Sequence, residues 1–248
     1  MSRNFELMQQ IEDDVLLRAR SGQSSPFTNP AALIRENERA PWADNEISTL
    51  VQKIFLMQTG DAPRVVVFAG IDHGDGCSRI AASVADSLAR TSRRPVCLVE
   101  ANFRSPALPD FFGTTNHFGL ADALLAENPI RSYGRAVGTD KLWLLSSGGL
   151  VGDSANLLNS EGIKTRMAEL RAEFDFVILD APPLSRYADA IAIGGLTDGL
   201  VLVLEAESTK REAAQAVTTS LRLAKVPILG AVLNKRVYPI PEGIYRRL

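Results

Sequence analysis

Stretches that are apolar throughout alternate with helix-forming stretches along most of this chain. Six apolar stretches lack the polar alternation of a sheet with one face in water: 65–69, 95–101, 142–146, 176–180, 199–204 and 227–234. Four stretches of helical character separate them: 78–90, 161–173, 186–194 and 209–224. Strands without alternation belong in a parallel sheet covered on both faces, so the sequence predicts a doubly wound, mostly parallel α/β fold. In such a fold, ligands bind at the carboxyl ends of the strands.

The predicted α/β domain spans residues 45–236 and begins with a helix that starts near Asn45. Residues 4–19 carry apolar side chains at helical spacing, and the polar stretch after them has the composition of a linker. We therefore predict that 1–44 forms an amphipathic helix and a linker, and that 237–248 is an exposed tail. The first helix has two open interpretations, because its apolar face packs on its own domain or docks onto a partner.

Charge and cysteine content exclude several classes of protein. The chain has 27 basic and 29 acidic residues, so it lacks the positive field that attracts nucleic acid, and no nucleic-acid partner is expected. Its two cysteines, Cys77 and Cys97, are not in a CxxC spacing, which argues against a structural zinc site. The first residues include acids where a signal peptide needs an apolar core, and no apolar run approaches the roughly 18 residues that span a bilayer. The sequence predicts a cytoplasmic protein that a partner would bring to the inner face of the membrane.

A glycine-containing loop follows the first apolar stretch and has the build of a phosphate-binding loop. Its sequence, IDHGDGCSR, places Gly74 and Gly76 where the backbone can wrap around an anion at the start of a helix. Ser78 stands where a hydroxyl would contact a metal ion, but Cys77 replaces the lysine of the full GxxxxGKS/T pattern. A plain turn without a ligand explains the loop equally well. The candidate nucleotide-binding residues here are Gly74, Asp75, Gly76, Cys77, Ser78 and Arg79.

Polar side chains end three of the other predicted strands. Asp180 closes the stretch 176–180, where an acid would hold Mg²⁺ or its water shell. Glu100 ends a second strand as a further candidate metal-binding or catalytic acid, and Asn234 ends the last strand, where it would face the base of a nucleotide. Each has an ordinary alternative, since Asp and Asn commonly form turns at strand ends. With Ser78, these residues predict one site for ATP or ADP with Mg²⁺.

The order of these motifs resembles the cytoplasmic ATPase domains of bacterial tyrosine kinases, which share the deviant-Walker class of P-loop NTPases with the Min and Par ATPases. The resemblance covers about residues 45–248 and is most specific in FDFVILDAPPLSRYADAIAI at 174–193 and GLVLVLEAESTKREA at 199–213. It implies a P-loop NTPase-like domain that uses ATP and Mg²⁺ and associates with itself. It also implies a membrane polysaccharide copolymerase or adaptor as partner, in exopolysaccharide synthesis or export.

The sequence departs from the family's pattern at the charged positions of the site. The family's P-loop lysine corresponds to Cys77. Of the two paired aspartates that the family carries after its second strand, the first corresponds to Glu100 and the second to Asn102, and only Arg104 and the proline of the R-x-P ending remain. A neutral thiol offers no cation to phosphate, so the resemblance and the departures together predict weak or absent catalysis.

The assembly helix and the tail of the family are altered as well. The ExxRxxR pattern used in ring assembly reads Glu46, Thr49 and Gln52 in this chain, so both arginines are absent. The tyrosine-rich tail is reduced to Tyr238 and Tyr245, which remain the candidate phosphorylation sites. These differences leave the assembly state open.

The predicted function is that of a pseudokinase which binds and regulates a membrane copolymerase. One alternative is an atypical ATPase or tyrosine autokinase that uses Asp180 and Glu100 around Mg²⁺ with a relocated cation, for example Arg79 or Lys235. A Min- or Par-type positioning ATPase is a further alternative. It is disfavoured by the near-neutral charge and by Asp72, which stands where those ATPases carry a signature lysine.

Overall fold

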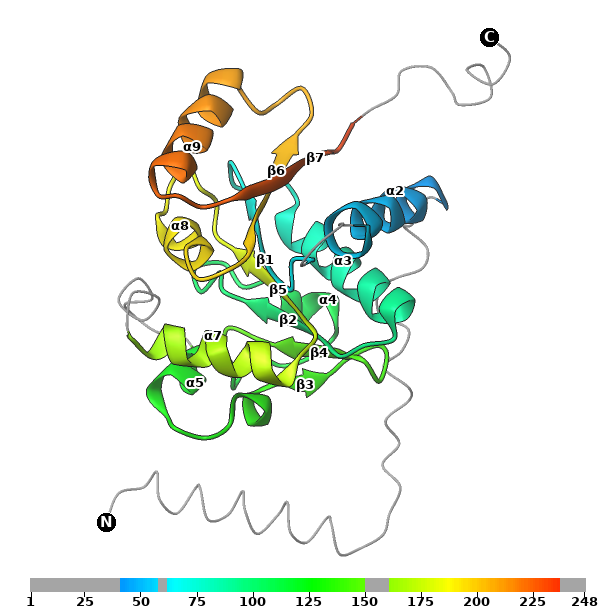
Figure 1. Ribbon diagram of the computed structural model, residues 1–248, viewed down its shortest axis with the longest axis vertical. Coiled ribbons are helices and arrows are strands. Elements are labelled where there is room, and N and C mark those ends of the chain that lie inside the picture. The colour runs from blue at the N-terminus through cyan, green and yellow to red at the C-terminus, as the bar shows by residue number, and fades with distance from the viewer. Residues whose placement is uncertain (1–40, 58–61, 150–160, 237–248) are drawn as a thin grey trace, which may run out of the picture. The chain divides into compact units, whose positions relative to one another are not determined.

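The computed structural model of the 248-residue chain describes residues 41–57, 62–149 and 161–236, which lie in one unit that begins at Ala31. Its centre is a seven-stranded sheet in the order β3-β4-β2-β5-β1-β6-β7 (Figure 1). The strands are β1 (Val65–Gly70), β2 (Val96–Glu100), β3 (Arg135–Ala136), β4 (Leu142–Leu145), β5 (Phe176–Ala181), β6 (Gly199–Glu205) and β7 (Ile228–Asn234). All neighbouring pairs are parallel except β3 and β4. The predicted doubly wound, mostly parallel α/β fold is confirmed.

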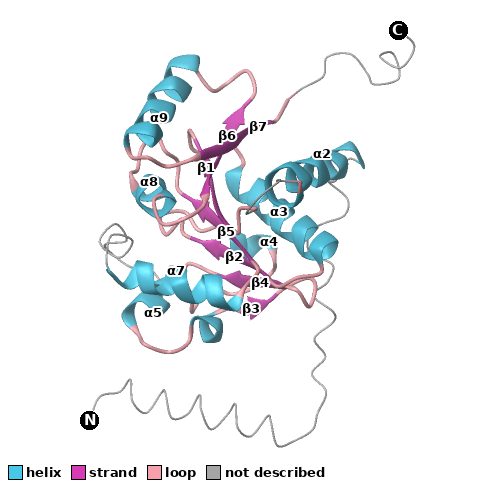
Figure 2. Ribbon diagram, in the orientation of Figure 1, coloured by secondary structure: helices cyan, strands magenta, loops and turns pink. Residues whose placement is uncertain are grey.

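Helices cover both faces of this sheet (Figure 2). They are α2 (Pro41–Val51), η3 (Gln52–Leu56), α3 (Cys77–Ser92), α4 (Leu108–Phe111), α5 (Leu120–Leu125), η4 (Ile130–Tyr133), α7 (Glu161–Glu173), α8 (Asp189–Gly194) and α9 (Arg211–Leu223). Successive residues of β1 face opposite sides: Val65 and Val67 pack with α5, α7, α8 and α9, whereas Val66 and Phe68 pack with η3, α3 and α4. The central strands are buried on both faces, which explains why their sequences are apolar throughout.

Several short elements between β2 and β4 were not predicted. α4, α5, η4 and the two-residue β3 have too few residues to show a period, so the sequence gives no signal for them. The predicted helix 186–194 begins only at Asp189, and the helix expected from Asn45 already begins at Pro41 and ends in a π-type turn. The predictions for the amphipathic helix at 4–19 and for the tail at 237–248 lie outside the described residues. Among the helices that the structure describes, none is long and apolar enough to cross a membrane.

A buried arginine holds the segment between α5 and η4 in place. Arg166 on α7 is only 5% exposed, and its guanidinium donates to the carbonyl oxygens of Ala123, Ala126 and Asn128. It also forms an ion pair with Glu169 at 2.6 Å, and Glu169 in turn accepts the N–H of Ile130. Because these carbonyl groups have no regular secondary structure to pair with, the guanidinium replaces the hydrogen bonds that a helix would supply.

We expect Arg166→Met to lower the free energy of unfolding by about 3–5 kcal/mol, since it leaves buried carbonyl groups and a carboxylate without their partner. Urea denaturation followed by circular dichroism measures this loss. The matched control is Arg222→Met on the exposed side of α9, which should change stability by less than about 0.5 kcal/mol. Equal effects of the two substitutions would show that the buried cluster is not needed.

Candidate functional site

The loop between β1 and α3 is a tight backbone turn at the carboxyl end of the central strand. Gly74 and Gly76 have φ values of 95° and 83°, a left-handed conformation that side-chain-bearing residues rarely adopt. Asp75 is buried between them, and its carboxylate accepts the N–H of Asp72 at 2.8 Å. The first turn of α3 begins at Cys77, so its leading N–H groups have no acceptors within the helix. This geometry can receive an anion.

Side chains from the end of β7 and from the loop after β5 hold this turn. The Asn234 amide nitrogen donates to the carbonyl oxygen of Asp75 at 2.8 Å. A Cβ atom at Gly76 would lie 2.3 Å from that nitrogen, so the position requires glycine for space as well as for its φ value. The Ser185 hydroxyl donates to the Asp72 carboxylate at 2.7 Å. Asn234 therefore lies at the loop and bonds to its backbone. Its expected contact with the base of a nucleotide stays a prediction.

Asp180 is the central charge of the site. It is fully buried at the end of β5, and neither carboxylate oxygen has a well-formed hydrogen bond within the described residues. Burial raises the pKa of Asp180 to about 6, and the nearby side chains of Ser78 and Cys77 offset part of that rise. An unpaired buried carboxylate is costly, so this position is suited to a cation.

Cys77 supplies no such cation. Burial and then the negative charge of Asp180 raise the pKa of the Cys77 thiol well above its ordinary value, so the thiol is neutral near pH 7. A neutral thiol can donate a hydrogen bond to Asp180, but it gives neither that carboxylate nor a phosphate a compensating positive charge. The same rise makes the thiolate rare, which argues against a redox role for this cysteine.

Glu100 has a structural contact that the sequence analysis missed. β2 and β5 are neighbours, so Glu100 lies opposite Asp180, but its carboxylate accepts the N–H groups of Ala107 and Leu108 at the start of α4. Burial chiefly raises the pKa of Glu100 to about 8, and the charge of Asp180 adds to the rise. Because α4 was not predicted, neither was this cap. The role of Glu100 as a metal ligand, which the sequence analysis predicts, stays a prediction.

Three basic residues that the sequence analysis singled out differ in their surroundings. Arg104 forms an ion pair with Asp189 at 3.3 Å, and its guanidinium lies 4.1 Å from the centre of the Tyr187 ring. Lys235 pairs with Glu205 at 3.0 Å, and Arg79 is exposed on the first turn of α3. The sequence analysis did not identify Asp189 as a partner of Arg104. The signal that the sequence offered for Asp189 is its position shortly after LDAPP, within the segment where the family resemblance is most specific.

The residues present supply some, but not all, of the groups that would bind a nucleotide with Mg²⁺. Asp180 and Ser78 remain for the metal side, where bound Mg²⁺ would neutralise charge on the phosphates. On the phosphate side, backbone N–H groups remain but the cation is replaced by the neutral Cys77. The site therefore keeps the shape of a nucleotide site without the full charge that phosphoryl transfer requires.

Sequence comparison relates the chain to kinases. It is 34% identical over 161 residues to the tyrosine-protein kinase YwqD of Bacillus subtilis, covering 65% of this chain and 68% of that protein. It is 30% identical over 185 residues to the succinoglycan biosynthesis transport protein ExoP of Rhizobium meliloti, covering 72% of this chain but only 23% of that protein. No family model matches the chain.

Solved structures with the same fold include two informative neighbours. The chimerical protein CapA2B2 aligns with a TM-score of 0.76 at 21% identity, over 85% of this chain and 92% of that chain. MinD from Pyrococcus horikoshii, complexed with Mg-ADP, aligns with a TM-score of 0.60 at 18% identity, over 74% of this chain and 76% of that chain. These likenesses establish a P-loop NTPase fold of the MinD and ParA type.

The fold is therefore that of the P-loop NTPases. Within that class, the match to the Bacillus subtilis kinase shows that the chain belongs to the bacterial tyrosine kinase family. Of these relatives, ExoP is the one whose name refers to polysaccharide production, as a succinoglycan biosynthesis transport protein.

We expect the free energy of unfolding to fall as the pH rises from about 4.5 to about 8. The folded protein holds a proton on Glu100 up to a pKa of about 8, whereas the unfolded chain releases it near 4.5, so the unfolded state binds fewer protons in this window. Asp180 acts in the same direction up to about pH 6. Each group contributes a slope of at most about 1.4 kcal/mol per pH unit.

Urea denaturation at pH 5, 6, 7 and 8 measures this dependence. Glu100→Gln should show a clearly smaller loss between pH 6 and 8 than the unsubstituted protein, since its amide has no proton to release. Glu127→Gln, on an exposed loop, is the matched control and should keep the original slope. Parallel curves for Glu100→Gln and the unsubstituted protein would contradict the assignment.

Proposed function

We propose that this protein works in exopolysaccharide synthesis or export as a kinase-family member that regulates a membrane partner, with phosphoryl transfer weak or absent. The observation that carries this proposal is the neutral Cys77 thiol beside the unpaired Asp180 carboxylate. Phosphoryl transfer depends on positioning and charge neutralisation, and loss of one charged phosphate contact typically costs about 2–4 kcal/mol. Of the candidate substitute cations, Arg79 is exposed on the first turn of α3 and Lys235 is paired with Glu205 at 3.0 Å.

The partner is proposed to be a membrane polysaccharide copolymerase or its adaptor. Two comparisons support this: ExoP, named a transport protein, carries a similar segment within a much longer chain, and CapA2B2 is a chimera that contains a domain of this fold. The exposed face of α2 and η3 is the candidate contact. Glu46, Thr49 and Gln52 line it, and Met57 at its end is 69% exposed. The same face is the candidate for self-association.

The alternative, an atypical tyrosine autokinase, rests on the same carboxylate. Asp180 and Ser78 remain available to a metal, and Tyr238 and Tyr245 are candidate acceptors, although they lie outside the described residues.

Incubation of the purified protein with ATP labelled at the γ-phosphate separates the regulatory proposal from the autokinase alternative. The regulatory proposal predicts no transfer above that of Asp180→Asn. Labelling that disappears in both Asp180→Asn and the double variant Tyr238→Phe, Tyr245→Phe would establish the autokinase instead.

A genetic test addresses regulation directly. We expect deletion of the gene in its native host to change exopolysaccharide yield or chain length, and Asp180→Asn on the chromosome to restore the normal product as well as the unsubstituted gene does. Met57→Glu should fail to restore it, because a charge on the candidate contact weakens docking. Leu223→Glu, at an 80% exposed position on α9, is the matched control and should restore it. Failure of Asp180→Asn alone would contradict a non-catalytic role.

A further inference from the structure

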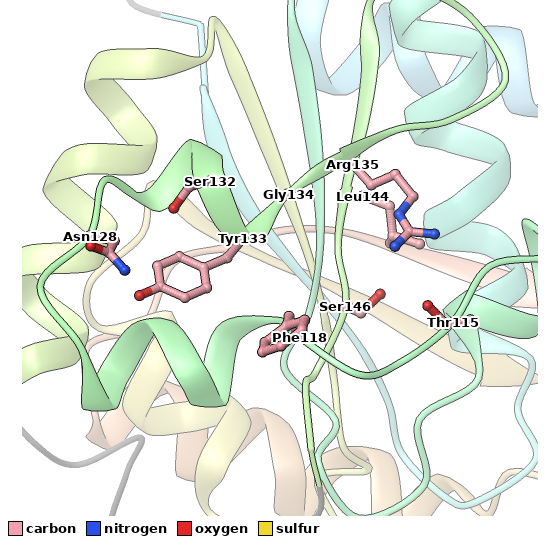
Figure 3. Close-up of a pocket in the computed structure, with 9 residues that line it drawn as sticks. All are labelled: Thr115, Phe118, Asn128, Ser132, Tyr133, Gly134, Arg135, Leu144 and Ser146. Carbon is pink, nitrogen blue, oxygen red and sulfur yellow. The ribbon is translucent and has the colours of Figure 1, made fainter. Parts of the chain in front are cut away.

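A second pocket lies at the other edge of the sheet from β7, beside β3 and β4. Its volume is about 340 Å³, which is within the range of small-ligand sites. The residues that line it come from the loop before α5, from η4 and from the carboxyl end of β4 (Figure 3). β2 and β5 separate β4 from β1, so this pocket is distinct from the loop at Gly74 and Gly76.

The walls of the pocket are fixed by partly buried hydrogen bonds. On one side, the Arg166 guanidinium binds the carbonyl oxygen of Asn128 at 2.9 Å. On the other, the Asn116 side chain bonds to the Ser147 hydroxyl at 2.9 Å and accepts the N–H of Gly148 at 3.0 Å. Both loops that line the pocket are therefore held without a ligand, so a ligand would bind with little ordering cost.

The lining combines an aromatic surface with several hydroxyl groups. Phe118 is 72% exposed, and its ring lies beside the cavity. The Tyr133 hydroxyl is buried, points along the same cavity toward Asn128, and has no hydrogen-bond partner among the described residues. Thr115 and Ser146 add two further hydroxyls on the other side of the Phe118 ring in Figure 3. Such a hydroxyl retains hydrogen-bonding capacity for a polar group.

One cation completes the lining. The Arg135 guanidinium donates one hydrogen bond to the Thr114 hydroxyl at 2.8 Å, and its remaining N–H groups are available to a ligand. Its planar fork suits a carboxylate or a phosphate. Among the described residues, no acidic side chain lines the pocket, so none of them offsets this charge from within it.

We propose that this pocket binds an acidic sugar, meaning a pyranose ring that carries a carboxylate or a phosphate. The flat apolar face of the ring would pack on Phe118, its hydroxyls would pair with Tyr133 and the neighbouring polar groups, and its acidic group would pair with Arg135. A purely apolar ligand would leave the Tyr133 hydroxyl unpaired, and free phosphate would not use the aromatic surface. This inference goes beyond the proposed function and does not depend on what the loop at Gly74 and Gly76 binds.

Titration calorimetry and saturation-transfer NMR of the full chain with four probes test the proposal. The probes are glucuronate, glucose 1-phosphate, glucose and inorganic phosphate. We expect at least one of the two acidic sugars to bind at least tenfold more tightly than glucose and than phosphate. Preference for glucuronate or for glucose 1-phosphate identifies the acidic group.

Variants locate the binding. Phe118→Ala should weaken binding of the acidic sugar at least tenfold, Arg135→Gln should reduce its affinity to that of glucose, and Tyr133→Phe should weaken it severalfold. Leu125→Ala, at a 71% exposed position, and Arg222→Gln are the matched controls and should bind normally, as should Asp180→Asn. Thermal unfolding by circular dichroism verifies that each variant is folded. The proposal is overturned if neither acidic sugar binds, or if binding is unchanged in folded Phe118→Ala and Arg135→Gln.

Discussion

The Asp180 carboxylate is the constraint on which the site depends. β5 carries it into the centre of the sheet, where it is fully buried and lacks a hydrogen-bond partner in the described part of the chain. A cation beside Asp180 would offset the cost of that burial. The neighbouring side chain of Cys77 is neutral and cannot act as that cation. The protein therefore keeps a buried charge at Asp180 without a cation at position 77, where the family resemblance places a lysine, and this mismatch limits what the site can do.

The loop stays folded because other contacts hold it. Asn234 and Ser185 bond to opposite parts of the turn, and Glu100 caps α4 instead of pointing to an open site. The two clusters of buried apolar side chains, one on each face of the sheet, hold the strands and helices together, so the fold does not need the missing lysine. Loss of charge at the site is thus compatible with retention of the architecture, and with the external surfaces through which a regulatory protein acts.

The sequence predicted the elements whose pattern is long and uniform. The six apolar strands and the turn at Gly74 and Gly76 follow from burial and backbone conformation, which are local properties. The sequence could not predict the Glu100 cap, the Arg166 cluster or the pocket beside Phe118, because each joins residues that are distant in the chain. The pKa of Asp180 was also beyond prediction, since it depends on burial and on neighbours that only the folded chain supplies.

The most direct test of the account is calorimetric titration of Mg-ADP into the unsubstituted protein, Cys77→Lys and the neutral control Cys77→Ser. If the site lacks only its cation, Cys77→Lys should bind about 30- to 800-fold more tightly than the other two, which corresponds to the 2–4 kcal/mol expected of a charged phosphate contact. Equal, tight binding by all three proteins would contradict the account, because it would show that a cation elsewhere already serves the phosphates. Absence of any gain in a folded Cys77→Lys protein would contradict it as well.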